Sequence, residues 1–126
     1  MRDWRKPLFV IAALYDGLIG LVFLFFWREL FDRMGITRPN HGGYVQFSAL
    51  LLVIFGWMFL RIARNPDANR ELIDFGIALK VAYSGIVFFY ELGTGVPPMW
   101  VWFAWFDVIF LILFVAARRS RMYRSA

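Results

Sequence analysis

Three ionisable residues, Asp16, Lys80 and Asp107, lie deep inside apolar stretches of the sequence. Each comes eight residues after the start of its stretch, at residues 8, 72 and 99, respectively. If the stretches are helices with a rise of about 1.5 Å per residue, each side chain lies about 12 Å into its helix. An unpaired charge at that depth in a bilayer costs about 2.5–3.5 kcal/mol. We therefore expect the three residues to meet at one level, close to the middle of the membrane.

The three residues comprise two acids and one base, so their formal charge is −1. Our hypothesis is that one aspartate pairs with Lys80, while the other keeps a proton or holds a cation. Glu91 lies on the same helical face as Lys80 but about 16 Å further along, at an outer mouth. The predicted ligand- or ion-binding residues, which include hydroxyl groups near the charges, are Asp16, Lys80, Asp107, Tyr15, Tyr83, Ser84 and Glu91. The alternative is a structural role, in which a buried ion pair only fixes the register of the helices.

Helical spacing places this polar centre on one side of its helix. At about 100° per residue, one face of residues 76–91 carries Gly76, Lys80, Tyr83, Ser84, Val87 and Glu91. The opposite face carries three small residues, to which a neighbouring backbone can come close: Ala78, Ala82 and Gly85. In the first apolar stretch, Asp16 shares a stripe with Ala13, Gly17 and Gly20. Small residues mark helix contacts in lipid, so we expect Asp16 to face the interior of a bundle.

The elements that must position these residues are four apolar stretches of roughly 20 residues each, which is the length that crosses a bilayer. They cover residues 8–27, 44–62, 72–92 and 99–117, in a chain of 126 residues that is 61% hydrophobic and 21% aromatic. We predict an all-α, integral membrane, antiparallel four-helix bundle that forms a single domain over residues 1–126. Apolar residues at helical spacing in 27–34 predict a short amphipathic helix at the membrane interface after the first span. The segment Asn65-Pro66-Asp67 is a helix-start signal, which predicts that the third helix begins at Pro66.

The basic residues predict the orientation of the chain. Three segments on one side of the predicted membrane carry ten of them, against three on the other side: Arg2, Arg5, Lys6, Arg61, Arg64, Arg70, Arg118, Arg119, Arg121 and Arg124, against Arg28, Arg33 and Arg38. By the positive-inside rule, both termini are expected in the cytoplasm and the protein in the cell (inner) membrane. Because the basic residues are divided among three membrane-edge segments, we expect contact with membrane lipids and no binding of nucleic acid.

No signature of an enzyme is present in the sequence. The chain has no cysteine and a single histidine, His41, in a loop. Neither supplies the ligand spacing of a metal site. The sequence also lacks a phosphate-binding glycine loop, an HExxH motif and a nucleophile elbow. We therefore expect no catalytic residues, no metal and no cofactor. The tryptophans at 100, 102 and 105 are interpreted as packing or lipid-facing residues.

The layout resembles that of small bacterial four-span membrane proteins of the DoxX-like kind. The resemblance rests on the short chain, on Tyr15-Asp16-Gly17 in the first span, on Gly76 with Lys80 in the third and on Asp107 in the fourth. It implies a four-helix membrane bundle and assigns no activity.

Two functions remain open from the sequence. In the first, the protein binds a small ligand, an ion or a proton at its polar centre, and transport is an extension of that binding. In the second, it is a non-catalytic accessory or assembly subunit of a larger membrane complex, with other membrane subunits or a second copy of itself as partners.

Overall fold

The computed structural model describes residues 3–120 and confirms the predicted all-α four-helix bundle. Its helices are α1 (Arg5–Arg33), α2 (Gly43–Arg64), α3 (Arg70–Leu92) and α4 (Pro98–Arg119). Each is long and apolar enough to cross a membrane, and each contains one of the predicted apolar stretches. Within the described residues there is no β-strand. The chain is therefore a multi-pass membrane protein by the length and composition of its helices.

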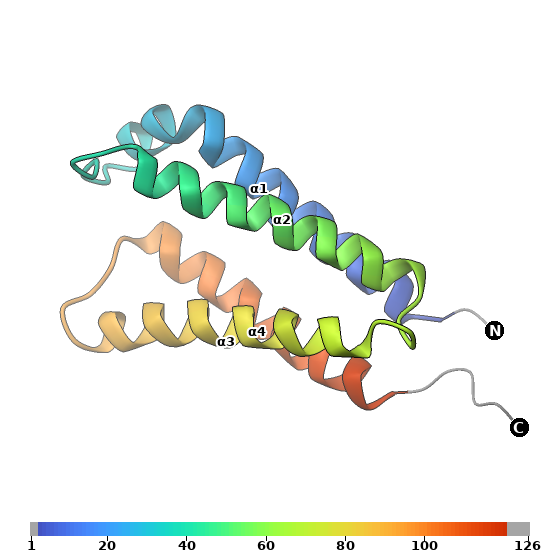
Figure 1. Ribbon diagram of the computed structural model, residues 1–126. Helices are drawn as coiled ribbons and strands as arrows, with labels where there is room; N and C mark the ends of the chain where they lie inside the picture. Colours follow the sequence, from blue (N-terminus) through green and yellow to red (C-terminus); the bar gives the residue numbers. More distant parts are fainter. Residues whose placement is uncertain (1–2, 121–126) are drawn as a thin grey trace, which may run out of the picture.

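The four helices form two hairpins, α1 with α2 and α3 with α4. Figure 1 shows that α2 and α3 lie close together at the end that carries both termini and move apart toward the opposite end, where the start of α4 lies between them. We call these the closed end and the open end. The two hairpins still touch near the open end, because the ring of Phe23 in α1 stacks on that of Trp100 in α4 with 5.8 Å between their centroids.

Glycines allow the two helices of the first hairpin to approach closely. An added Cβ on Gly20 of α1 would lie 2.7 Å from the backbone oxygen of Ala49 on α2. On Gly56 of α2 it would lie 3.0 Å from the backbone oxygen of Ala13. Backbone atoms cannot move aside as a flexible side chain can, so α1 and α2 are fixed at a distance that only glycine permits at these positions.

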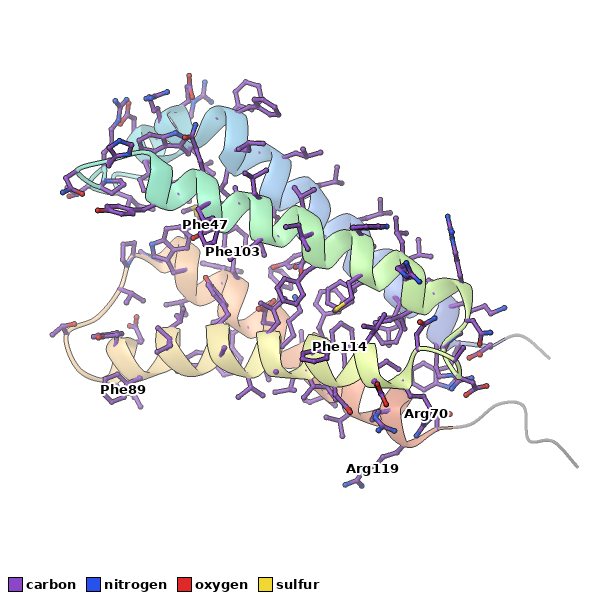
Figure 2. All side chains as sticks on the ribbon, viewed as in Figure 1. Phe47, Arg70, Phe89, Phe103, Phe114 and Arg119 are labelled. Atoms are coloured by element: carbon purple, nitrogen blue, oxygen red, sulfur yellow. The ribbon has the colours of Figure 1, made fainter. Side chains whose placement is uncertain are left out.

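Aromatic side chains fill the closed end. Phe9, Phe59 and Phe114 come from α1, α2 and α4, and all three are fully buried. The ring centroid of Phe114 lies 4.8 Å from that of Phe9 and 5.2 Å from that of Phe59. Figure 2 shows Phe114 nearer the termini and Phe103 nearer the open end. This layer separates the middle of the bundle from the closed end.

A buried arginine ties the closed end together beyond the aromatic layer. The Arg5 side chain is fully buried and lies 2.7 Å from Asp3 Oδ2 and 2.8 Å from Asp67 Oδ1. It also donates a hydrogen bond of 3.0 Å to the backbone oxygen of Ser120. These hydrogen bonds lower the pKa of Asp3 and of Asp67 below the ordinary value of 3.8. One guanidinium thereby joins the start of α1, the α2–α3 loop and the end of α4.

A kink separates the amphipathic segment from the rest of α1. Phe26 leaves the helical region, with φ −126° and ψ 20°, and the chain is helical again from there to Arg33. Beyond this break Trp27 and Phe31 are buried, while Arg28 is exposed. The segment therefore has the expected two faces, and its place at a membrane interface stays a prediction.

The third helix begins four residues later than predicted. Asn65 does cap a turn, since its Oδ1 accepts a hydrogen bond of 3.2 Å from the Ala68 backbone N–H. The turn is not continued, because Asn69 leaves the helical region with φ −116° and ψ 30°. The same turn presents Asp67 to Arg5, so a tertiary ion pair accompanies the interruption.

Candidate binding site

Lys80 forms an ion-pair cluster with both buried aspartates. Its Nζ lies 3.0 Å from Asp16 Oδ1, 3.2 Å from Asp16 Oδ2 and 3.0 Å from Asp107 Oδ1. The three side chains are 1%, 3% and 9% exposed for Lys80, Asp16 and Asp107, respectively. The prediction that they meet is confirmed. The hypothesis that Lys80 pairs with only one aspartate was wrong, because an ammonium group has three donors and can serve two carboxylates at once.

The cluster links the two hairpins. Asp16 belongs to α1, whereas Lys80 and Asp107 belong to α3 and α4. Lys80 shares its buried face with Gly76, Ser84 and Val87, as the helical spacing predicted. The ion pair between Asp16 and Lys80 therefore connects the two hairpins, in addition to the ring contacts of Phe23 with Trp100 and Phe103.

Aromatic rings surround the ammonium group. Lys80 Nζ lies 5.1 Å from the ring centroid of Phe110, 5.5 Å from that of Tyr15 and 5.8 Å from that of Phe59. Each distance is short enough for a cation–π attraction. Phe59 and Phe110 were not predicted as site residues. Phe110 lies one helical turn after Asp107, and this spacing is the signal that identifies it.

A cavity of about 600 Å³ extends from the cluster toward the open end. Among residues 3–120, the charged residues that line it are only Asp16, Lys80 and Asp107, and the others are mostly aliphatic or aromatic. Residues of the α1–α2 loop close to the open end also line it. The full lining is Tyr15, Asp16, Ile19, Phe23, Phe31, Ile36, Thr37, Pro39, Tyr44, Val45, Ser48, Ala49, Leu51, Leu52, Phe55, Leu79, Lys80, Tyr83, Trp100, Phe103 and Asp107. Both the volume and the mixture of an apolar wall with a few polar groups are typical of small-molecule sites.

Two polar atoms beside the cluster have no hydrogen-bond partner among the described residues. The Tyr15 hydroxyl is buried and unpartnered. Asp107 uses Oδ1 for Lys80, and its Oδ2 accepts no hydrogen bond from residues 3–120. Buried polar groups are usually satisfied in native structures. These two atoms therefore offer a donor and an acceptor to something that enters the cavity.

Of the seven predicted site residues, five line the cavity and two do not. Tyr83 lines it, but its hydroxyl donates a hydrogen bond of 3.0 Å to the backbone oxygen of Trp100 and so holds α3 against α4. Ser84 is buried and donates at 2.6 Å to the Lys80 backbone oxygen of its own helix. Glu91 is exposed, and its Oε2 accepts a hydrogen bond of 3.2 Å from the Val96 backbone N–H. The structure brings neither Ser84 nor Glu91 to the carboxylates.

Sequence reasoning missed most of the aromatic lining. It assigned the tryptophans of α4 to packing or lipid, which agrees with Trp102 and Trp105, whose side chains are exposed. Trp100 and Phe103, however, line the cavity. Both lie on the helical face of Asp107, at seven and four residues before it. Their spacing from the buried acid was the available signal.

Comparison of the chain with protein-family models, with curated proteins and with solved structures finds no match. The resemblance to DoxX-like proteins is therefore still a prediction. The site has to be interpreted from its own geometry.

Proposed function

We propose that this multi-pass membrane protein binds a small, largely apolar molecule in its central cavity and recognises a polar group of that molecule at the cluster of Asp16, Lys80 and Asp107. The observation that carries the proposal is a cavity of about 600 Å³ in which, within the described part of the chain, these three are the only charged lining residues. Polar groups that converge in an otherwise apolar pocket are the usual arrangement of a ligand site. The proposed function is binding without catalysis.

The structural alternative explains fewer of these features. A buried ion pair that fixed only the helix register would need neither a cavity beside it nor unpartnered polar atoms. Here the Tyr15 hydroxyl and Asp107 Oδ2 have no partner among residues 3–120, and both belong to residues that line the cavity. Ionisable residues inside a membrane commonly mark substrate or ion pathways.

Transport would extend this binding. The aromatic layer and the Arg5 network obstruct the closed end, whereas loop residues that line the cavity place it toward the open end. A site in contact with both halves of the molecule is the arrangement around which alternating access takes place in transporters. In this proposal a rocking motion of the two hairpins about the cluster would carry the ligand across.

Filling the cavity tests the proposal. Ile19→Trp places a large ring in the cavity, whereas Ile11→Trp makes the same change on an exposed face of α1. We expect a thermal-shift screen of small apolar molecules on the purified chain to yield a ligand that stabilises the native protein and the Ile11→Trp variant but not the Ile19→Trp variant. At a free concentration of 100 times Kd, the stabilisation should be about 2.7 kcal/mol. A ligand that stabilises both variants equally would place binding elsewhere and contradict the proposal.

We also propose that both termini lie in the cytoplasm and that the protein resides in the inner membrane. The closed end carries Arg61 and Arg64 at the end of α2 and Arg118 and Arg119 at the end of α4. Of the other basic residues used in this prediction, Arg2, Arg121 and Arg124 lie outside the described residues. The positive-inside rule favours this orientation.

Cysteine labelling in intact cells tests the orientation. A cysteine at Asn40 should react with an impermeant reagent, while one at Asn69 should react only after the membrane is permeabilised. The chain has no native cysteine, so each variant would carry a single label. The reverse pattern would mean that the orientation is inverted.

A second candidate function is that of an accessory subunit. The small residues Ala78, Ala82 and Gly85 are all exposed on α3, and an added Cβ on Gly85 would meet nothing. No other helix of the described chain uses this stripe, although such stripes are typical of helix contacts in lipid. Purification in a mild detergent tests this function. Stable co-purification of other subunits that is lost in Gly85→Leu but kept in Ile86→Leu, a change at an exposed neighbour, would support it.

A further inference from the structure

The ammonium group of Lys80 is already shared between two carboxylates. Its Nζ lies 3.0 and 3.2 Å from the two oxygens of Asp16 and 3.0 Å from Asp107 Oδ1. Among residues 3–120, an anionic group that entered the cavity would thus meet two carboxylates and a single ammonium that is already paired with both. The geometry disfavours an anionic ligand.

The groups that remain available favour a positively charged or hydrogen-donating ligand. Asp107 Oδ2 accepts no hydrogen bond from the described residues, and Asp107 lines the cavity with a side chain that is only 9% exposed. With both carboxylates ionised and Lys80 protonated, the cavity has a formal charge of −1. A buried net charge is costly in an apolar surrounding, and one positive charge would neutralise it.

The walls of the cavity suit a large apolar cation. Phe23, Phe31, Trp100 and Phe103 line it beyond the cluster, on the side of the open end. The face of an aromatic ring attracts a cation, and the attraction is stronger where water is excluded. A small inorganic cation would make little use of these rings, whereas an organic cation with apolar substituents would contact both the rings and the carboxylate.

We infer that the cavity binds lipophilic organic monocations, such as hydrophobic ammonium or phosphonium ions, with the positive centre beside Asp107 and the apolar substituents against the aromatic wall. This inference rests on the proposed binding function and specifies its ligand class. The selectivity follows from the excess carboxylate. A unit charge about 8 Å away, at an effective dielectric constant of about 20, changes binding on the order of thirtyfold.

Three probes of similar size and different charge test the inference on the full chain in detergent. They are tetraphenylphosphonium, the neutral triphenylphosphine oxide and the anion tetraphenylborate, each measured separately by equilibrium dialysis against empty micelles. We expect the cation to bind on the order of thirtyfold more tightly than the neutral probe, and the anion to bind least. We also expect binding of the cation to be lost in Ile19→Trp and kept in Ile11→Trp.

A matched pair of variants tests the role of the carboxylate. Asp107→Asn removes one negative charge from the cavity, and Asp74→Asn removes one from an exposed site on the same hairpin, where Asp74 pairs with Arg118. The preference for the cation over the neutral probe should disappear in Asp107→Asn and persist in Asp74→Asn. The comparison of probes on the unaltered chain does not depend on the folding of any variant.

The outcomes separate the inference from the proposed function. If all three probes bind equally, or the anion binds best, and binding is lost in Ile19→Trp, the cavity is a ligand site but the inferred ligand class is wrong. If Asp107→Asn and Asp74→Asn lose the preference for the cation equally, the Asp107 carboxylate is not the group that recognises the cation. If no probe binds above the micelle background, the inference fails, whereas the proposed binding function fails only if the thermal-shift screen also yields no ligand that depends on the cavity.

Discussion

The cluster of Asp16, Lys80 and Asp107 predicts unequal effects for the two aspartates. Asp16 provides two of the three oxygens that contact Lys80 Nζ and connects the two hairpins, whereas Asp107 provides one oxygen from the neighbouring helix of the same hairpin. Asp16→Asn and Asp107→Asn keep the size of each side chain and remove its charge. Lys80→Met removes the shared partner of both.

The magnitudes follow from the contacts. A hydrogen bond to a charged group contributes about 1.5–3 kcal/mol. The amide oxygen of asparagine can replace the single contact of Asp107 but only one of the two contacts of Asp16. We therefore expect Asp16→Asn to lower the free energy of unfolding by about 2–3 kcal/mol and Asp107→Asn by about 1 kcal/mol. Removal of one partner of a buried ion pair costs about 3–5 kcal/mol in soluble proteins. Lys80→Met should cost less than this, because the carboxyls it leaves unpaired can take up protons.

A double-mutant cycle measures these couplings. Unfolding in mixed micelles, followed as the fraction of denaturing detergent is raised, gives the free energy for each single variant and for the two double variants. We expect a coupling energy between Lys80 and Asp16 of about 2 kcal/mol, and a smaller one, under about 1 kcal/mol, between Lys80 and Asp107. Additive effects for both aspartates would mean that Lys80 contacts neither. A larger coupling to Asp107 than to Asp16 would refute the geometry of the cluster.

Two further predictions concern the closed end and the first hairpin. Because hydrogen bonds from Arg5 lower the pKa of Asp67 below 3.8, the pair should stabilise the fold at neutral pH, and this contribution should be lost as the pH falls through about 4 and below. Stability of the native chain should therefore fall more steeply with acid than that of Arg5→Gln, and parallel pH profiles would exclude a role for the pair. Gly20→Ala should destabilise the protein by about 1–3 kcal/mol, since the new methyl group would meet the Ala49 backbone oxygen at 2.7 Å. Gly17→Ala, three residues away with nothing within 4 Å of its added Cβ, should be neutral or stabilising in the same unfolding measurement, and equal effects at both glycines would show that α1 and α2 do not meet at Gly20.

The sequence alone predicted the class of fold and the level of the charges. Four apolar stretches of sufficient length are expected to form helices in a bilayer, because every backbone polar group must form its hydrogen bond within its own segment. Equal distances from the helix starts placed Asp16, Lys80 and Asp107 at one level, and the cost of an unpaired charge in lipid made their meeting the expected result. Helical periodicity identified the buried face of α3, on which Gly76, Lys80 and Ser84 indeed lie.

Local signals were weaker where tertiary contacts compete with them. Asn65 caps a turn as its sequence context predicts, but the turn ends before α3, and Asp67 within it is paired with Arg5, which is distant in the sequence at the start of α1. The amphipathic periodicity of residues 27–34 agrees better with the structure, because a kink at Phe26 sets this segment apart from the rest of α1 and its apolar side chains pack into the bundle. A helix-start signal reports only the conformational preference of its own segment. The tertiary contact that overrides this preference comes from a residue that is distant in the sequence.

Only the tertiary structure decided how the charges are shared and where the cavity lies. Periodicity places a side chain on a helical face but does not determine the rotation and distance of neighbouring helices, which depend on close contacts such as that of Gly20 with Ala49. Those distances determine that Lys80 serves both aspartates and that Asp107 keeps one oxygen free. They also determine that Trp100 and Phe103 line a cavity while Trp102 and Trp105 are exposed at the outer surface. An aromatic side chain can pack in a core, face lipid or line a ligand site, and the sequence does not distinguish these three roles. The position of the neighbouring helix decides between them.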